Sequence, residues 1–398
     1  MLRSVVWFWF LSCGVALGNA GCAEGEAAPD VGGRARDLGP PVPEQPLADM
    51  GQPGNDATPG TAGGDASVPI SPGDPLAISE REAWVWVPME TMQCANGSSG
   101  GFAVNLTDRS RELVLYLQGG GVCHNTLTCS ASLIDSVGDD PLRTALDGGV
   151  TSNQGIFDRS DPTNPFRDAN FAVLPHCTGD HHIGDSVRSY GARTVHHHGF
   201  ANVARTTERL LATFPDASRV TVSGFSAGGV GITGNYQRIA QSFEAVGGPT
   251  PFLVIDAGPF LQRPHLAEGS ESDLIEAWNL EETVLPYCEE CVEQGLSALY
   301  RANLRAHPGL RQSLLCAYED SVVKLMYTAI GSVVGAAALR TGLLELADAH
   351  ADESSMRFFF YSGDRHGALH LPADATPGLR DFLNRQVDGS FNWSSVIP

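Results

Sequence analysis

Three regions of the chain differ in how apolar and polar residues are arranged. Residues 5–17 are mostly apolar, residues 23–79 consist largely of Pro, Gly, Ala and Asp without a hydrophobic period, and residues 80–398 contain repeated apolar runs. A stretch without an apolar face cannot bury enough surface to offset the entropy lost on ordering. We therefore expect a disordered acidic linker over 23–79 and one folded domain over 80–398.

Within 80–398, short apolar runs alternate with segments of helical pattern. Several runs are continuously apolar over the length of a strand, which is typical of parallel strands buried on both faces. Between two of them, Leu210, Leu211 and Phe214 follow helical spacing. This alternation predicts an α/β fold with a mostly parallel central sheet flanked by helices. The predicted strands lie in 112–121, 170–177, 219–229, 251–258, 312–320 and 356–364.

The apolar N-terminal segment resembles an export signal. Arg3 is the only charge before it, and the run is too short to span a bilayer. The residues that follow, Asn19-Ala20-Gly21-Cys22, are similar to a bacterial lipobox, although Asn19 stands where an apolar residue is usual. We expect residues 1–22 to be a signal peptide, so that the protein is either a cell-envelope lipoprotein anchored through Cys22 or a freely secreted bacterial protein.

The charge of the chain excludes some partners. The 398 residues include 25 Lys and Arg against 46 Asp and Glu, a formal net charge of −21. This charge repels phosphate backbones and anionic lipid, and it disfavours polyanionic substrates unless a basic patch offsets it. We expect no nucleic acid partner, membrane contact only through a lipid anchor, and a monomer.

A candidate nucleophile lies in residues 224–228, which read Gly-Phe-Ser-Ala-Gly. This pattern also occurs by chance in Gly-rich turns, but here it follows an apolar strand and precedes a helix-compatible stretch. That context predicts a nucleophile elbow with Ser226 exposed at its tip. The Gly run after Gln118, at the end of another predicted strand, is typical of an oxyanion loop. The backbone N–H of Ala227 is the expected second oxyanion donor.

A serine nucleophile needs a base and an acid, which should follow it in the order acid, then His. His366 lies just after the last predicted strand, where the loop with the catalytic histidine is expected. Asp320 ends the preceding strand, where a carboxylate that orients the base is expected. The alternatives that remain open are His370 for the base, and Asp256 and Glu319 for the acid.

The cysteines indicate disulfides. Nine occur, and seven of them lie beyond residue 22. In the oxidising compartment that an exported protein enters, cysteines form disulfides by default. Cys123 and Cys129 flank a short loop. Cys288 and Cys291 form a C-x-x-C, for which zinc is the rival interpretation, but no second pair lies at zinc-site spacing. Cys316 lies within an apolar strand, where a buried free thiol is expected.

Two runs of adjacent histidines suggest a metal site. They are His181-His182 and His196-His197-His198. Adjacent side chains point in divergent directions, and no carboxylate lies at the matching helical spacing. We therefore interpret these residues as loop and pocket-edge histidines, and we expect no metal and no cofactor.

In combination, the motifs resemble those of the pectin acetylesterase and Notum superfamily of secreted α/β-hydrolases. The similar segments are 94–100, 119–123, 176–184, 224–229 and 256–258, in the family's order. The resemblance implies an α/β-hydrolase fold, disulfides Cys94–Cys177 and Cys123–Cys129, and no cofactor. It also implies Ser226 as nucleophile, Asp320 as acid, His366 as base, and an oxyanion hole of Gly120, Gly121 and Ala227.

Two departures from the family pattern leave the substrate open. Gly121 replaces the Trp of eukaryotic members, and His176 replaces a Tyr. The sequence predicts a secreted serine esterase that hydrolyses O-acyl esters, chiefly O-acetyl esters on carbohydrate, through a Ser-His-Asp triad and an acyl-enzyme. The alternatives are a polyhydroxyalkanoate-type depolymerase or lipid-ester carboxylesterase, because a fold does not fix its substrate, and a surface binding module without turnover.

Overall fold

A computed structural model of the chain describes residues 68–131, 135–147, 154–332 and 334–398. All of these residues belong to one compact unit. The predicted signal peptide, the lipidation at Cys22 and most of the predicted linker lie outside the described residues. Within the described ranges, no helix combines the length and the apolar character that a membrane span requires.

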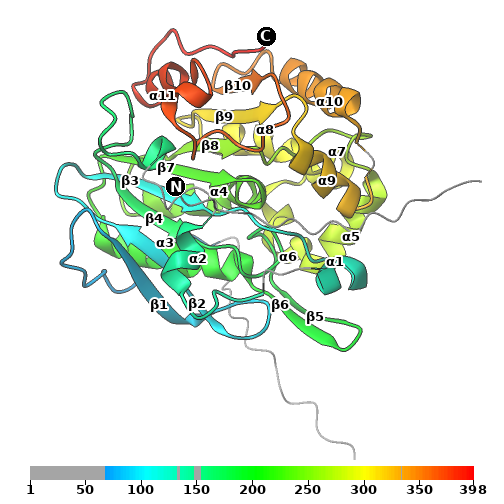
Figure 1. Cartoon of the computed structure of the whole chain (residues 1–398), viewed down its shortest axis with the longest axis horizontal. Coiled ribbons are helices and arrows are strands. Elements are labelled where there is room, and N and C mark those ends of the chain that lie inside the picture. Colours follow the sequence, from blue (N-terminus) through cyan, green and yellow to red (C-terminus); the bar gives the residue numbers. More distant parts are fainter. Residues whose placement is uncertain (1–67, 132–134, 148–153, 333) are drawn as a thin grey trace, which may run out of the picture. The chain divides into compact units, whose positions relative to one another are not determined.

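An eight-stranded sheet forms the centre of the domain (Figure 1). Its strand order is β1-β2-β4-β3-β7-β8-β9-β10, and all pairs from β4 to β10 are parallel. Only β1–β2 and β2–β4 pair antiparallel within this sheet. The predicted α/β fold with a mostly parallel sheet is therefore confirmed. The strands are β1 (Trp84–Gln93), β2 (Ser99–Asn105), β3 (Glu112–Leu117), β4 (Asn170–Leu174), β7 (Arg219–Phe225), β8 (Phe252–Asp256), β9 (Gln312–Ala317) and β10 (Met356–Tyr361).

Helices connect and cover these strands, and β5 (Ser186–Tyr190) pairs with β6 (Arg193–His197) in a separate hairpin. Short 3-10 turns lie at 155–157, 285–287, 296–298 and 373–375. The helices are α1 (Thr126–Ala131), α2 (Pro141–Leu146), α3 (Gly199–Thr213), α4 (Ala227–Ala245), α5 (Glu268–Trp278), α6 (Leu280–Thr283), α7 (Cys291–Gln294), α8 (Leu299–Ala306), α9 (Ser321–Ala329), α10 (Ala336–Ala349) and α11 (Leu379–Val387).

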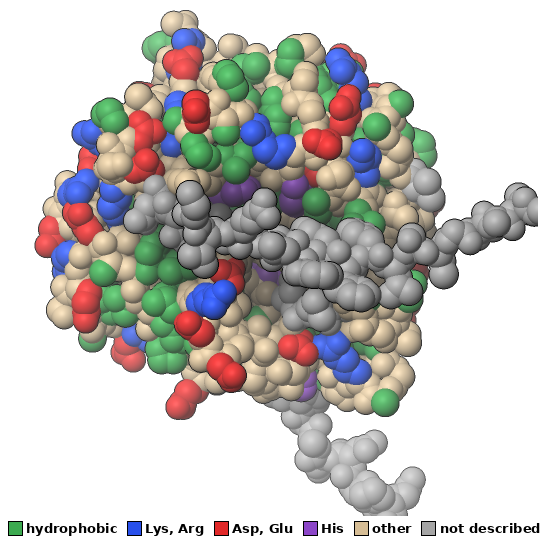
Figure 2. Space-filling model, in the orientation of Figure 1, with side chains coloured by type: hydrophobic (Ala, Val, Ile, Leu, Met, Phe, Trp, Pro, Cys, Tyr) green, Lys and Arg blue, Asp and Glu red, His purple; other side chains and the backbone are tan. Residues whose placement is uncertain are grey.

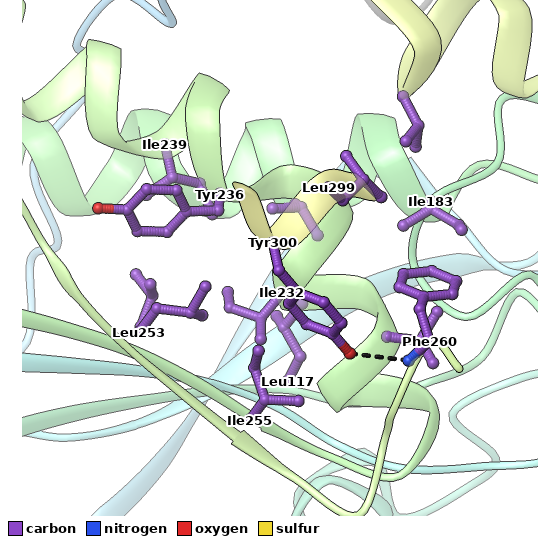
Figure 3. Close-up of a cluster of buried hydrophobic side chains, with 14 of the residues drawn as sticks. Leu117, Ile183, Ile232, Tyr236, Ile239, Leu253, Ile255, Phe260, Leu299 and Tyr300 are labelled. Carbon is purple, nitrogen blue, oxygen red and sulfur yellow. Dashed lines mark hydrogen bonds between the residues drawn. The ribbon is translucent and has the colours of Figure 1, made fainter. Parts of the chain in front are cut away.

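Each face of the sheet carries its own apolar core. Side chains alternate between faces along a strand. In β3, Leu115 and Leu117 pack with α3 and α4, whereas Val114 and Tyr116 pack with α2 and α11 on the other face. Figure 3 shows the first core, in which Ile232, Tyr236 and Ile239 of α4 lie over the strand residues Leu253 and Ile255. Burial on both faces explains why these strands are continuously apolar.

The folded part of the chain begins before residue 80. Ile70 is buried, and its backbone N–H donates to Ser242 Oγ of α4. The N–H of Leu76 donates to Thr213 Oγ1 at the end of α3, and the N–H of Gly73 donates to the carbonyl of Glu208. The C-terminal end of the expected linker therefore packs against α3 and α4.

Three disulfides join the described cysteines: Cys94–Cys177, Cys123–Cys129 and Cys288–Cys291. The two pairs that the family resemblance implies are confirmed, and so is the C-x-x-C bridge. Cys316 is a buried free thiol in β9, as the sequence predicts.

We expect the Cys94–Cys177 disulfide to contribute strongly to stability. It closes a segment of 83 residues between the end of β1 and the segment after β4. A bridge over a long segment lowers the conformational entropy of the unfolded chain. Losing such a bridge typically lowers the free energy of unfolding by about 2–5 kcal/mol. The double variant C94S/C177S should melt several degrees below the unaltered domain in calorimetry. The matched C123S/C129S variant opens a segment of only six residues and should lose less. Equal losses would contradict the expected dependence on segment length.

The surface carries charges of both signs. Figure 2 shows Asp and Glu side chains interspersed with Lys and Arg over one face, with histidine side chains near its middle. Some arginines pair with carboxylates, as in Arg81–Asp108 and Arg111–Asp216. Exposed pairs of this kind contribute little to stability, so the acidic excess of the chain remains its main electrostatic feature.

Candidate active site

Ser226 occupies a sharp turn between β7 and α4, as the G-x-S-x-G pattern predicts. Its backbone has φ 56° and ψ −121°, a conformation that residues other than Gly rarely adopt. The two flanking glycines make this turn possible. A Cβ on Gly224 would overlap the carbonyl of Gly228, and a Cβ on Gly228 would overlap the carbonyl of Leu117 in β3. The Ser226 N–H donates to the Asp256 carbonyl at 2.7 Å, which ties the turn to the end of β8.

His366 and Asp320 are in direct contact. The Nδ1 atom of His366 lies 2.9 Å from Oδ2 and 3.0 Å from Oδ1 of Asp320. Asp320 is completely buried, and its Oδ1 also accepts the N–H groups of Val322 and Val323. Asp320 is thus the N-cap of α9, and this cap fixes the carboxylate that faces the imidazole. If Nδ1 donates to Asp320, Nε2 is left as the proton acceptor.

The His366 ring meets the elbow through Phe225, the residue before Ser226. The centroids of the two rings are 4.6 Å apart. The Nε2 atom of His366 is buried and has no hydrogen-bond partner in the described part of the chain, so no hydrogen bond joins it to Ser226. In ligand-free enzymes, hydrogen bonds of catalytic groups are often long and shorten only in the substrate complex.

The alternative residues have other contacts. His370 also packs against Phe225, at 4.8 Å between centroids, but its Nδ1 has no partner among the described residues. Glu319 is exposed. Asp256 is fully buried, and its carboxylate accepts the N–H groups of Ala368 and Leu369 at 2.8–3.1 Å. Asp256 therefore holds the backbone of the loop that carries His366, whereas Asp320 holds its ring.

The predicted oxyanion loop begins beside the elbow. A Cβ on Gly119 would lie 2.9 Å from Ser226 Cβ, closer than such atoms approach in proteins, so only Gly fits there. The loop is held at Gln118 through both its N–H and its carbonyl group. The N–H of Gln118 donates to the Leu174 carbonyl, and His182 Nε2 lies 2.9 Å from the Gln118 carbonyl. Gly120 and Gly121 follow with partial or full exposure, and Ala227 opens α4.

A family model described as Pectinacetylesterase matches residues 86–298, more than half of the chain. The chain belongs to the pectinacetylesterase family. Ser226 and the oxyanion loop lie inside the matched range, and Asp320 and His366 follow it.

The chain is also similar to proteins named palmitoleoyl-protein carboxylesterase. It is 28% identical to human NOTUM over 179 residues, which cover 43% of this chain and 35% of the human protein. It is 26% identical to notum1 of Xenopus laevis over 196 residues, 47% of this chain and 38% of the relative. It is 24% identical to NOTUM of Schmidtea mediterranea over 180 residues, 44% of this chain and 33% of the relative. The matched part thus spans roughly a third of the length of each relative.

Of the adjacent histidines, His181, His182 and His197 are buried behind the predicted oxyanion loop. Asp180 is fully buried and accepts the Thr178 hydroxyl and the N–H groups of His182 and Gly199. His197 Nδ1 lies 3.0 Å from the Thr178 carbonyl. The contact of His182 with the carbonyl of Gln118, at the start of the predicted oxyanion loop, was not predicted from the sequence. Its only sequence signal was the position of 176–184 among the family motifs. Within the described ranges, no group of three or more His, Cys, Asp or Glu could hold a metal ion.

We expect acid to destabilise the fold through this network. Burial lowers the pKa of His181 to about 3, and of His182 and His197 to about 4. Below pH 6.5 the unfolded chain binds protons that these folded histidines do not, so their contribution to stability is lost as pH falls from about 6.5 to about 4. Burial raises the pKa of Asp180 and Asp256 to about 6, so these two groups add stability as pH falls below 6 and partly offset the loss.

Burial also lowers the pKa of His176 and His370, so the histidines outnumber the two carboxyls. The melting temperature should therefore fall by several degrees between pH 7.5 and pH 4.5. Calorimetry across this range at constant ionic strength tests the prediction. The variant H197N removes one of the groups that resist protonation, so its loss should be smaller than that of the unaltered domain. A melting temperature that rises toward pH 4.5 would mean that the carboxyls dominate.

A small apolar cavity lies near the elbow, one turn along α4 from Ser226. Val230, whose N–H donates to the Ser226 carbonyl, forms one wall. Phe260, Trp278 and Met326 of α9 are among the other lining residues. The volume of the cavity is about 20 Å³. This is little more than one water molecule needs, so the aromatic and aliphatic side chains nearly fill the space.

Proposed function

We propose that the protein is an exported serine esterase that hydrolyses short O-acyl esters, above all O-acetyl esters on carbohydrate. The observation that carries the proposal is the contact of His366 with the buried carboxylate of Asp320, beside the elbow that presents Ser226. A Ser hydroxyl alone is a weak nucleophile, and an oriented imidazole is the group that activates it. Membership of the pectinacetylesterase family and the carboxylesterase relatives support ester hydrolysis.

The proposed reaction has two halves. Ser226 Oγ attacks the ester carbonyl carbon while His366 Nε2 takes the hydroxyl proton, and Asp320 stabilises the imidazolium. Backbone N–H groups of Gly120, Gly121 and Ala227 stabilise the oxyanion. The carbon–oxygen bond to the sugar then breaks, the sugar oxygen takes the proton from His366, and the acyl group stays on Ser226. A water molecule, deprotonated by His366, then attacks the acyl carbon. The bond from this carbon to Ser226 Oγ breaks, His366 returns the proton to Ser226 Oγ, and the acid is released.

The small cavity supports a short acyl group. One wall residue, Val230, lies one turn of α4 after Ser226, and the cavity volume of about 20 Å³ suits little beyond an acetyl methyl group. A palmitoleoyl chain, which the names of the relatives specify, is a long acyl group that needs far more room. We therefore propose that this chain differs from those relatives in acyl length.

The disulfides support export. Three bridges in one domain are typical of proteins that fold in an oxidising compartment. The proposal includes two exported forms: a lipoprotein anchored through Cys22 and a freely secreted protein. Mass spectrometry of the mature N-terminus distinguishes the two forms.

A series of p-nitrophenyl esters tests the acyl preference. The unaltered domain should hydrolyse acetate fastest, and kcat/KM should fall steeply from butyrate to octanoate. M326A enlarges the cavity and should raise the hexanoate-to-acetate ratio of kcat/KM by about fourfold for each methylene newly accommodated, since burying a methylene contributes about 0.8 kcal/mol.

The matched control is L325A, because Leu325 lies beside Met326 on α9 with its side chain 54% exposed. It should leave the ratio unchanged. Hydrolysis of long acyl chains only would contradict the acetylesterase proposal and favour a lipid-ester carboxylesterase. A chain that neither turns over any ester nor reacts with a fluorophosphonate at Ser226 would be a binding module.

A further inference from the structure

A second, polar pocket of about 290 Å³ opens near the oxyanion loop. It lies between the residues before α1, strand β5 and helix α5, which Figure 1 shows on the same side of the molecule. Its volume is close to the lower limit for pockets that hold small ligands. The side chains that define its chemistry are His124, Arg188, Ser189, Tyr190, Asp273 and Glu276.

The pocket and the oxyanion loop share one rigid segment of chain. Consecutive Cα atoms lie 3.8 Å apart, so His124 is within about 19 Å of Gly119, the residue in contact with Ser226. The segment is fixed at Cys123, whose N–H donates to the Gly179 carbonyl and whose carbonyl accepts the Trp278 Nε1–H, both at 2.8 Å. The Cys123–Cys129 disulfide holds the same residue. A ligand in the pocket is therefore held in a defined position relative to the reacting serine.

The pocket offers unused hydrogen-bonding groups of both kinds. Asp273 and Glu276 lie three residues apart on the exposed face of α5, and their carboxylates accept no hydrogen bond from the described residues. Ser189 is exposed and its hydroxyl is equally unused. Arg188 Nη2 donates to the Glu276 carbonyl, which leaves its Nε without a partner in the described part of the chain. Carboxylates, a hydroxyl and a guanidinium together match the donors and acceptors of a polyol.

One wall of the pocket is aromatic and prepositioned. Tyr190 packs against the small cluster around the Cys123–Cys129 disulfide, and its hydroxyl lies 3.1 Å from His197 Nε2. Its orientation is therefore set before any ligand arrives. An aromatic wall with a few convergent polar groups is the usual composition of a site for a small polar ligand.

The charge of the pocket selects among sugars. Two carboxylates face a single guanidinium, and burial lowers the pKa of His124, which keeps that ring neutral at neutral pH. The net charge of the lining is negative. A uronate would meet repulsion there, whereas a neutral sugar hydroxyl donates to either carboxylate.

We propose that this pocket is a subsite for a neutral sugar residue of the oligosaccharide or polymer whose O-acyl group reacts at Ser226. The proposal rests on the proposed esterase function and adds the class of substrate: a neutral acetylated glycan long enough to reach both places. Small esters, such as p-nitrophenyl acetate or an acetylated monosaccharide, do not reach the pocket.

The test compares the activity of double variants on two substrates, an acetylated oligosaccharide and p-nitrophenyl acetate. D273A/E276A removes both unused carboxylates from an exposed helix face, where Ala is well tolerated. The KM for acetylated xylo-oligosaccharides should rise about tenfold or more, because hydrogen bonds to charged groups are lost, while kcat changes less than twofold. The kcat/KM for p-nitrophenyl acetate should stay within twofold of the unaltered protein. Circular dichroism verifies folding.

The matched control is E281A/E282A, which removes two exposed carboxylates from the adjacent helix α6 outside the pocket lining. It should change neither substrate's KM. A second variant, D273N/E276Q, keeps hydrogen-bonding atoms and removes the charge. It should raise the rate on acetylated polygalacturonate relative to acetylated xylan several-fold.

The outcomes separate the two proposals. An unchanged KM for xylo-oligosaccharides in D273A/E276A, with normal activity on p-nitrophenyl acetate, overturns the sugar subsite and leaves the esterase intact. An equal rise in KM in E281A/E282A overturns it as well, because the effect would then be one of total charge. A preference of the unaltered protein for acetylated polygalacturonate over xylan overturns the neutral-sugar assignment. Absence of all ester hydrolysis overturns both proposals.

Discussion

Ser226→Ala should lower kcat for p-nitrophenyl acetate by about 10⁶-fold and leave the fold unchanged. In the proposed mechanism the hydroxyl oxygen forms the acyl-enzyme, and removing this small group does not enlarge the core. The turn conformation at this position is set by Gly224, Gly228 and the bond from the residue's N–H to Asp256, and none of these needs the hydroxyl. Stopped-flow and steady-state rates, with circular dichroism as the folding check, give the measurement.

His366→Ala should cost about as much as Ser226→Ala, because a nucleophile and its base act as one unit. The double variant should then be no slower than either single variant. His370→Ala is the matched control, since His370 packs against the same face of the elbow through Phe225. Near-native activity in His366→Ala beside an inactive His370→Ala would move the base to His370.

Asp320→Asn should lower kcat by roughly 10⁴-fold in a fully folded protein. The amide oxygen of Asn still accepts the N–H groups of Val322 and Val323, and Asn is as good an N-cap as Asp, so α9 stays in place. What changes is the group that faces His366 Nδ1. An amide N–H there favours the tautomer with the proton on Nε2, which cannot accept the proton of Ser226.

Asp256→Asn should have the opposite profile. Both oxygens of Asp256 accept N–H groups of the loop after His366, and an amide would place its own N–H against one of them. We expect a lower melting temperature and a raised KM, with kcat reduced less than tenfold. Turnover of one activated ester by both variants, with melting curves, distinguishes them. A folded, active Asp320→Asn beside a folded, inactive Asp256→Asn would transfer the acid role to Asp256.

The elbow and the positions of the parallel strands along the chain are well predicted from the sequence, because both depend on local chemistry. A small-residue pattern between a β run and a helical run specifies the turn at Ser226, and continuous apolar runs specify strands buried on both faces. The contact of Asp320 with His366 was also predicted, from the positions of the two residues at the ends of successive strands.

What the sequence could not predict depends on contacts between distant segments. The role of His182 depends on the carbonyl of Gln118, and that of Asp256 on the N–H groups of Ala368 and Leu369, more than a hundred residues away. Ile70 is buried beside Ser242 of α4, a contact between segments far apart in the sequence. The Pro- and Gly-rich composition around Ile70 gave no indication that the folded part of the chain begins before residue 80. The two pockets arise from side chains of several elements, and no pattern along the chain marks them.

The two attachments of Asp256 have a consequence for how such enzymes diversify. Its carbonyl holds the backbone of Ser226 and its carboxylate holds the loop of His366, so one residue sets the spacing between the two ends of the site. Between residues 257 and 365, α5 contributes side chains to both pockets and α9 contributes side chains to the apolar cavity, and the direct link through Asp256 includes neither helix. Substitutions in α5, and in α9 beyond its N-cap Asp320, could therefore reshape substrate choice without displacing the proposed catalytic groups. Laboratory evolution aimed at new esters would do best to vary these two helices and keep both Asp256 and Asp320 fixed.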